Sequence, residues 1–254
     1  MISLPFYFRQ SLFGYFCRRW QTRRFEKHTL PGAEMAEVEG VKLEIADLNL
    51  EMKRVVLEGR YEAAELAICR DLISPGERIL DIGAGIGCVG LFCLKRMKAA
   101  SVISVEANPA TAERLRRNYE INGFKAACIG AALAAEDGTA ALHTNSDFWC
   151  DSLNPDRAGA DRRTLTMRAL TFSSILREVG TEFSTLLADV EGAEEFLAWE
   201  CLPACTSKVL LEIHPEVLGA PRAFDVVYRL MLQGFEVTHA KGQVFGLVRK
   251  DIRS

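Results

Sequence analysis

A carboxylate and three glycines follow a short apolar stretch in the first half of the chain. The run is Ile79-Leu80-Asp81-Ile82-Gly83-Ala84-Gly85-Ile86-Gly87. It predicts a strand that turns sharply into a helix, which leaves free backbone N–H groups and a positive dipole end at the turn. Glycines there let a ligand approach the backbone closely. A nucleotide-like ligand at the carboxyl end of a parallel strand fits this geometry.

A second carboxylate, Glu106, lies 19 residues after Gly87, in the run Val105-Glu106-Ala107-Asn108-Pro109. A carboxylate at the end of the strand beside a glycine-rich turn can accept hydrogen bonds from ribose hydroxyls. We therefore expect the cofactor site to include Gly83, Ala84, Gly85 and Gly87 from the turn and Glu106, Ala107 and Asn108 from the next strand end.

The glycine spacing and Asp81 discriminate among nucleotide ligands. Nicotinamide cofactors favour G-x-G-x-x-G, but here the third fingerprint position falls on Cys88. Asp81 would repel a pyrophosphate and attract an ammonium group. S-adenosylmethionine carries an α-ammonium and no phosphate, so the sequence predicts this cofactor. A nicotinamide-dependent oxidoreductase and a non-catalytic binding protein with a cofactor fold are the alternatives.

Further acidic residues and a histidine follow two later predicted strands. Asp189 and Glu191 come after Phe183–Ala188, and His214 ends Val209–Ile213. Methyl transfer to an alcohol needs alignment of three atoms and a base that removes a proton. Asp189, Glu191 and His214 are the candidate catalytic residues, each with a structural alternative at a strand end or helix start. A metal bound by Asp189, Glu212 and His214 is a less favoured interpretation, so no metal is expected.

Together these motifs resemble the FkbM-type methyltransferases, within the class I S-adenosylmethionine-dependent enzymes. Further similarity lies in Tyr61-Glu62, in Asn118-Tyr119-Glu120-Ile121-Asn122-Gly123 and in Asp189-Val190-Glu191-Gly192-Ala193-Glu194. The resemblance implies O-methylation of a hydroxyl on a sugar, a polyketide or a similar small or carrier-bound acceptor. It also implies that Tyr61 and Glu62 close over the methionine end of the cofactor. Leu187 departs from the family pattern, which has lysine there.

Strand and helix patterns alternate from residue 78 onward, which predicts a Rossmann-like, doubly wound, mostly parallel α/β sheet. The predicted helices include 88–97, 109–121, 193–201 and 223–232, and one predicted strand covers 126–132. Residues 235–239 and 244–248 predict a closing antiparallel hairpin. Residues 144–163 are polar and irregular, which favours a lid or substrate loop.

Charge and composition divide the chain into three expected parts: an N-terminal extension (1–34), a small strand–helix region (35–77) and a methyltransferase domain (78–254). Residues 1–28 hold six Lys or Arg against one acid, whereas the whole chain has a net charge of −3. Aromatic residues interleave with these bases. The segment could dock on the protein itself or a second subunit, lie on an anionic membrane, or precede a true start at Met35.

Global properties limit the partners and the compartment. The pI near 5.9 gives no sign of nucleic-acid binding. Eight cysteines without a Cys-x-x-Cys pair indicate free thiols in a reducing compartment. No apolar run is long enough to span a bilayer. A cytoplasmic protein, with membrane association through residues 1–28 as an option, is the expectation.

Overall fold

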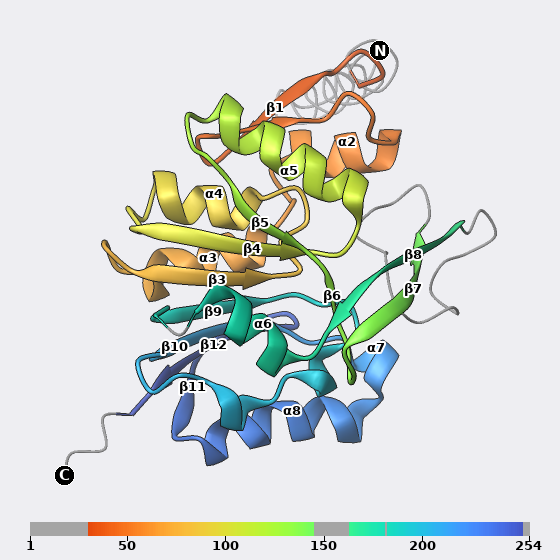
Figure 1. Ribbon diagram of the computed structural model, residues 1–254. Helices are drawn as coiled ribbons and strands as arrows, with labels where there is room; N and C mark the ends of the chain where they lie inside the picture. Colours follow the sequence, from red (N-terminus) through yellow and green to blue (C-terminus); the bar gives the residue numbers. More distant parts are fainter. Residues whose placement is uncertain (1–29, 145–162, 181, 251–254) are drawn as a thin grey trace, which may run out of the picture.

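A seven-stranded sheet forms the centre of the computed structural model, which describes residues 30–144, 163–180 and 182–250 (Figure 1). The strand order is β5-β4-β3-β9-β10-β12-β11, and all strands except β12 run parallel. Their bounds are β3 Arg78–Ile82, β4 Ser101–Glu106, β5 Ala127–Gly130, β9 Thr185–Ala188, β10 Lys208–Glu212, β11 Phe235–Lys241 and β12 Val244–Arg249. The predicted Rossmann-like fold and closing hairpin are confirmed.

The strand order reverses between β3 and β9, because the chain passes from β3 to β4 and β5 and then returns to the other side of β3. Ligands bind outside the carboxyl ends of strands at such a switch point. The glycine turn follows β3, and Asp189 follows β9. The fold therefore brings two motifs together that lie about 100 residues apart in the sequence.

Alternating apolar residues of the central strands point into two separate cores. Ile79 belongs to one cluster, and Leu80 and Ile82 belong to the other. The first core is covered by α3 (Ala63–Leu72), α4 (Cys88–Lys95) and α5 (Pro109–Ile121). The second is covered by α6 (Phe172–Val179) and α8 (Ala220–Leu232). Helices on both faces explain why the strands are buried on both sides.

A hairpin of β1 (Met35–Val38) and β2 (Val41–Glu44), followed by α2 (Leu50–Leu57), completes the first core. Asn118 of α5 is fully buried and links this hairpin to the glycine turn. Its Oδ1 accepts a hydrogen bond from Glu44 N at 2.7 Å, and its Nδ2 donates one to Ile86 O at 2.9 Å.

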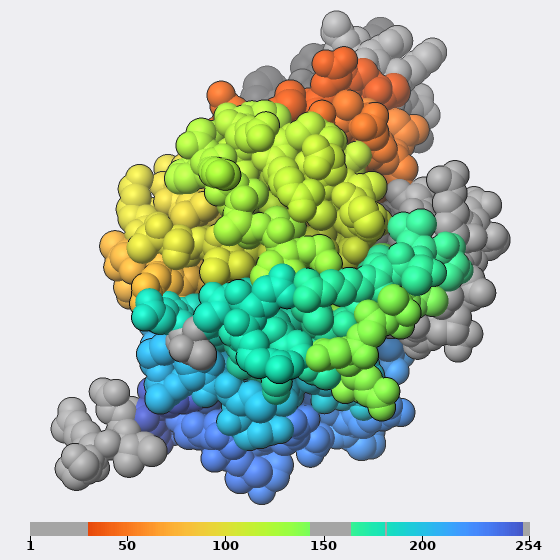
Figure 2. All heavy atoms as spheres, viewed as in Figure 1, coloured from red at the N-terminus to blue at the C-terminus, as the bar shows by residue number. Residues whose placement is uncertain are grey.

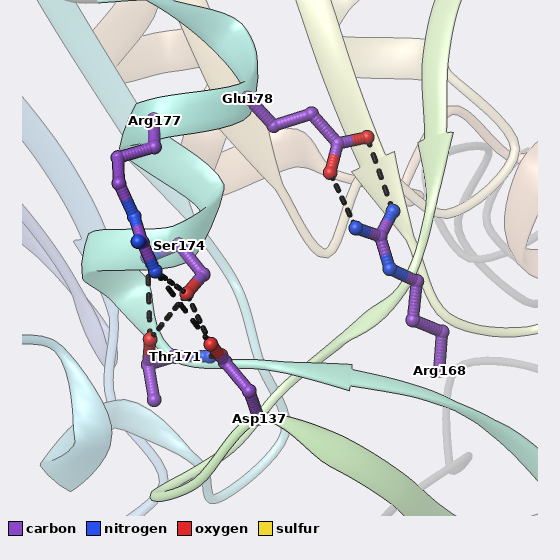
Figure 3. A network of polar contacts seen from close by, with 6 residues as sticks. All are labelled: Asp137, Arg168, Thr171, Ser174, Arg177 and Glu178. Carbon is purple, nitrogen blue, oxygen red and sulfur yellow. Dashed lines mark hydrogen bonds and ion pairs between the residues drawn. The ribbon is translucent and has the colours of Figure 1, made fainter.

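A small three-stranded sheet projects beside the main sheet in Figures 1 and 2. It comprises β6 (Ala132–Leu133), β7 (Gly138–Thr144) and β8 (Arg163–Leu170). Figure 3 shows how polar contacts tie it to α6: Arg168 pairs with both carboxylate oxygens of Glu178, at 3.1 and 2.7 Å. Asp137 accepts hydrogen bonds from Thr171 N and Ser174 Oγ, at 2.7 and 2.5 Å.

Two predicted elements are wrong. The predicted helix 193–201 is replaced by two short 3₁₀ turns, Glu194–Phe196 and Trp199–Cys201. Here Leu197 and Trp199 are buried in the second core, and a continuous helix is interrupted at extended Leu197. The predicted strand 126–132 is also broken, because the chain leaves the main sheet after Gly130 and begins β6 at Ala132.

Several predictions fall wholly or largely outside the described residues. The loop 144–163 is described only at its two ends, and the basic segment 1–28 is not described. Within the described ranges, no helix is both long and apolar enough to cross a membrane.

Candidate functional site

The glycine turn between β3 and α4 is held close to the end of β9. Gly83 has φ +79°, and a Cβ placed on it would lie 1.5 Å from the carbonyl oxygen of Asp189. Gly87, the N-cap of α4, has φ +84°, and a Cβ there would lie 2.8 Å from the Tyr119 ring. Both positions therefore require glycine for conformation and for space.

Glu106 joins the glycine turn to the start of α5. One carboxylate oxygen accepts from Gly85 N at 2.9 Å and the other accepts from Asn108 N at 2.8 Å. Asn108 in turn caps α5, because its side chain accepts from Ala110 N. Each carboxylate oxygen can accept a second hydrogen bond. Glu106 thus fixes the two loops.

Asp81 lies beneath the turn and is 5% exposed. Burial raises its pKa to about 7. Its Oδ2 has no hydrogen-bond partner among the described residues and lies 3.1 Å from the place of a Cβ on Gly90, toward α4. A buried carboxyl without a partner is unfavourable in its charged form, and a bound cation would relieve this cost.

A cavity of about 430 Å³ adjoins the ends of β9 and β10 and the tip of the β11–β12 hairpin. The N-terminal end of α3 forms another wall, where Tyr61 is buried and Glu62 has φ +54°. Arg60 and Lys241 also line it. The carboxylates that line it are Glu62, Glu65, Asp189, Glu191 and Glu212. We call this the acidic cavity.

Crowding of these carboxylates in a poorly solvated space disfavours their charged forms. Burial raises the pKa of Asp189 well above its usual value, and the charges of Glu191 and Glu212 raise it further. Burial and the neighbouring Glu65 raise the pKa of Glu212 to about 7. The pKa of Glu62 is raised well above its usual value by burial and by Glu65. The cavity is therefore suited to a positively charged occupant.

His214 lies at the edge of this group, with its side chain 5% exposed. Its Nδ1 lies 2.5 Å from Oε1 of the fully buried Glu194. Its Nε2 lies 3.3 Å from Glu191 Oε2 and 3.8 Å from Asp189 Oδ1. Burial opposes protonation of the ring, but the Glu194 hydrogen bond and the charges of Glu191 and Glu194 outweigh it, and the pKa of His214 is raised.

The structure divides the predicted site residues into two neighbouring groups. Asp81, Gly83–Gly87 and Glu106–Asn108 surround the turn after β3. Tyr61, Glu62, Asp189 and Glu191 line the acidic cavity, and His214 contacts the last two. Sequence reasoning did not identify Glu65 and Glu194, whose positions depend on packing between separate elements. The Glu194 that ends the Asp189–Glu194 run was the available signal for one of them.

Residues 44–137 match the family model of the TRM5/TYW2 methyltransferase domain. This stretch covers the glycine turn and Glu106. The predicted cofactor motifs thus lie in a stretch that is similar to a methyltransferase domain. Domains of this kind use S-adenosylmethionine, so the predicted cofactor is confirmed at the level of the domain.

Several similar proteins were found by comparison of sequence and of structure. A ribosomal protein L11 methyltransferase from Symbiobacterium thermophilum is 31% identical over 81 residues, which is 30% of this chain and 25% of that protein. The match therefore spans about a quarter of the length of that relative. Among solved structures, ribosomal protein L11 methylase from Lactobacillus delbrueckii subsp. bulgaricus is similar with 15% identity and a TM-score of 0.46, covering 75% of this chain and 79% of the other.

TYW2 from M. jannaschii, solved in complex with AdoMet, is also similar, with 14% identity and a TM-score of 0.44 over 84% of this chain and 82% of the other. At these values structural similarity carries no information on the acceptor.

The resemblance to FkbM-type enzymes is wrong, because the matching domain is of the TRM5/TYW2 type. The cofactor motifs that suggested it lie in the part that class I methyltransferases share. The late run that seemed most specific, Asp189–Glu194, has a local structural role here: Glu194 accepts from Gly192 N and holds His214. Methylation of a sugar or polyketide hydroxyl rested on that resemblance and has no support from the relatives.

Proposed function

We propose that this protein is an S-adenosylmethionine-dependent methyltransferase whose acceptor enters the acidic cavity. The observation that carries the proposal is the placement of two buried carboxylates, Asp81 and Glu106, around a glycine turn at the switch point. When bound, the cofactor supplies a methyl group on a sulfonium, which is transferred by direct displacement.

The residues around the turn fit this cofactor. Asp81 would hold the methionine ammonium through the oxygen that does not face α4, or through a water molecule. Glu106 would accept from the ribose hydroxyls while it continues to accept from Gly85 N and Asn108 N. The backbone of Gly83–Gly87 would approach the cofactor, and Tyr61 and Glu62 would close the methionine end.

On the acceptor side we assign Asp189, Glu191 and His214. Asp189 lies against Gly83, so the acidic cavity begins where the donor site ends. Displacement needs the acceptor atom, the methyl carbon and the sulfur in line, and this adjacency allows it. His214 is a poor free base near neutral pH because its pKa is raised, so a carboxylate is the better candidate to take up a proton.

Isothermal titration of the full chain with S-adenosylmethionine and S-adenosylhomocysteine tests the proposal. Glu106→Ala should weaken binding by about 1–3 kcal/mol, because it removes charge-assisted hydrogen bonds. Glu113→Ala is a matched control, since Glu113 lies on the exposed surface of α5. Absence of binding by the unaltered protein would refute the function, and equal affinity of both variants would refute the role of Glu106.

A further inference from the structure

Three side chains at the acidic cavity have the arrangement of ligands to one metal ion. Asp189, Glu212 and His214 each offer a ligand atom, and these atoms all lie within 4.8 Å of one another. Asp189 follows β9, Glu212 is the last residue of β10, and His214 lies two residues farther along the chain. The strands β9 and β10 are adjacent and parallel. We propose that they bind a divalent transition-metal ion beside the acceptor. Its role in catalysis rests on the proposed function, but the binding of the ion does not.

The histidine is fixed in the orientation that metal ligands require. Nδ1 is hydrogen-bonded to Glu194 Oε1 at 2.5 Å, and Glu194 is fully buried. When the ring is neutral and Nδ1 is the donor, Nε2 carries the lone pair. This nitrogen lies 3.8 Å from Asp189 Oδ1 and 3.3 Å from Glu191 Oε2, and a metal ion would take the place of a proton on it. Metal-binding histidines almost always have their second nitrogen held by a carboxylate or carbonyl in this way. The ring is 95% buried, so it has little access to water.

Asp189 supplies a second, independent observation. Its Oδ1 is shielded from solvent and has no hydrogen-bond donor among the described residues. This is the oxygen that lies 3.8 Å from His214 Nε2. A buried carboxylate oxygen without a donor is unfavourable. A cation between Asp189 Oδ1 and His214 Nε2 would satisfy both atoms.

Among the described residues, the two Lys or Arg side chains that line the cavity form no ion pair with its carboxylates. Arg60 lines the cavity but pairs with Glu58 outside it, and no contact described for Lys241 joins it to the cavity carboxylates. An ammonium group of an acceptor could also enter an acidic cavity. A metal ion explains more, because it accounts for the buried Glu194–His214 pair as well as for the negative charge.

The mixture of donors selects the class of ion. An imidazole with carboxylates suits Mn²⁺, Fe²⁺, Co²⁺ or Zn²⁺, whereas Ca²⁺ and Mg²⁺ prefer oxygen alone. With three protein ligands, an ion here would keep positions open on the cavity side. Such an ion could hold and polarise an acceptor oxygen.

Mn²⁺ added to the chelator-treated full chain tests the site, with the signal of free Mn²⁺ followed by electron paramagnetic resonance. We expect one Mn²⁺ per chain. Glu212→Gln and His214→Gln should each weaken binding at least tenfold. Glu194→Gln, which alters the support of His214 and leaves the three proposed ligands in place, should weaken it by about 10–100-fold. Glu195→Gln is the matched control: it removes a charge one residue away that pairs with exposed Arg222, and it should leave Mn²⁺ affinity within twofold.

Pulsed paramagnetic resonance adds a readout that a purely structural role would not produce. Bound Mn²⁺ should show coupling to an imidazole nitrogen, and this coupling should vanish in His214→Gln. Circular dichroism and the thermal midpoint establish that each variant is folded. Weak Mn²⁺ binding without saturation, binding unchanged in folded His214→Gln, or saturable binding of spermidine without Mn²⁺ would overturn the metal site. The last result would indicate an amine acceptor.

Titration with S-adenosylmethionine separates this proposal from the proposed function. Cofactor binding without a Mn²⁺ site would support the proposed methyltransferase function and refute the proposed metal site. A Mn²⁺ site without cofactor binding would support the proposed metal site and refute the proposed methyltransferase function.

Discussion

Asp81 and Gly83 lie two residues apart and have opposite effects on the stability of the fold. Gly83 is needed because the backbone of Asp189 occupies the place of a side chain. Asp81 is unfavourable for the fold, because burial raises the pKa of its carboxyl to about 7 without a compensating donor to Oδ2. A residue that opposes stability beside one that the fold requires is typical of a binding site.

The raised pKa of Asp81 predicts a pH-dependent effect of Asp81→Asn. The folded protein binds the Asp81 proton more tightly than the unfolded chain does. This contribution to stability is therefore complete below about pH 4 and is lost as pH rises through about 7. Asparagine resembles the protonated form, so the variant should gain up to about 4 kcal/mol over the unaltered protein above pH 7.

Denaturant unfolding at pH 5 and pH 8 measures this difference, and calorimetry at pH 8 should show weaker cofactor binding in Asp81→Asn. An equal stability difference at the two pH values would contradict the assignment.

Comparison of Gly83→Ala with Gly123→Ala separates the energetic cost of a left-handed backbone conformation from the cost of a steric clash. Both glycines have φ near +80°, but a Cβ at Gly123 meets nothing within 4 Å. Gly123→Ala should cost about 1–2 kcal/mol from the left-handed conformation alone. Gly83→Ala should cost more than about 4 kcal/mol or prevent folding, because Asp189 must also move. Similar thermal midpoints for the two variants would disprove the close approach.

At the scale of elements, α5 positions the cofactor loops without contributing a predicted ligand of its own. Asn108, which donates to Glu106, caps its first turn. Farther along the helix, Asn118 contacts Ile86 of the glycine turn and Glu44 of β2. The run Asn118–Gly123 is one of the sequence features that resemble the FkbM-type enzymes. The structure gives it a physical role as the connection between three elements.

Asn118→Ala tests this connection. It leaves the part-buried N–H of Glu44 and the buried C=O of Ile86 unpaired, so it should lower the free energy of unfolding by about 2–4 kcal/mol. Asn122→Ala is the comparison. Its bonds to Lys42 N and O are exposed, and those to Lys95 Nζ and Asn118 O are part-buried, so no fully buried group loses a partner and the cost should be about 1 kcal/mol. Urea unfolding measures both, and a larger loss for Asn122→Ala would contradict this view of α5.

At the scale of the whole molecule, charge separates the first 28 residues from the rest. They hold six Lys or Arg against one acid, while residues 35–254 have a net charge of −7. We propose that this segment serves attachment, either to an anionic surface or to a second copy.

Flotation with phosphatidylserine-containing vesicles tests the attachment. The full chain should float at low salt and lose this property at high salt, because the attraction is electrostatic. The variant that lacks residues 1–28 should remain in solution under both conditions. Equal flotation of the two forms would exclude the segment as the anchor, and a change of oligomeric state in the variant would instead favour self-association.

The sequence by itself determined the donor half of this protein. The strand, turn and helix that begin at Arg78 follow from local sequence patterns. The spacing of Asp81, the glycines and Glu106 reflects the backbone geometry of one β-α-β unit, so this motif can be recognised without the tertiary structure. The same reasoning failed at residues 193–201, where burial of Leu197 and Trp199 overrode the helical pattern.

Only the tertiary structure decided the acceptor half. Glu62 precedes α3 and Glu65 lies in it, Asp189 and Glu191 follow β9, and Glu212 ends β10. Their proximity depends on the strand order and on helix packing, which local spacing does not encode. The pairing of Glu194 with His214 likewise joins two loops 20 residues apart. The sequence therefore indicated the cofactor, whereas the fold created the acidic cavity in which the acceptor is proposed to bind.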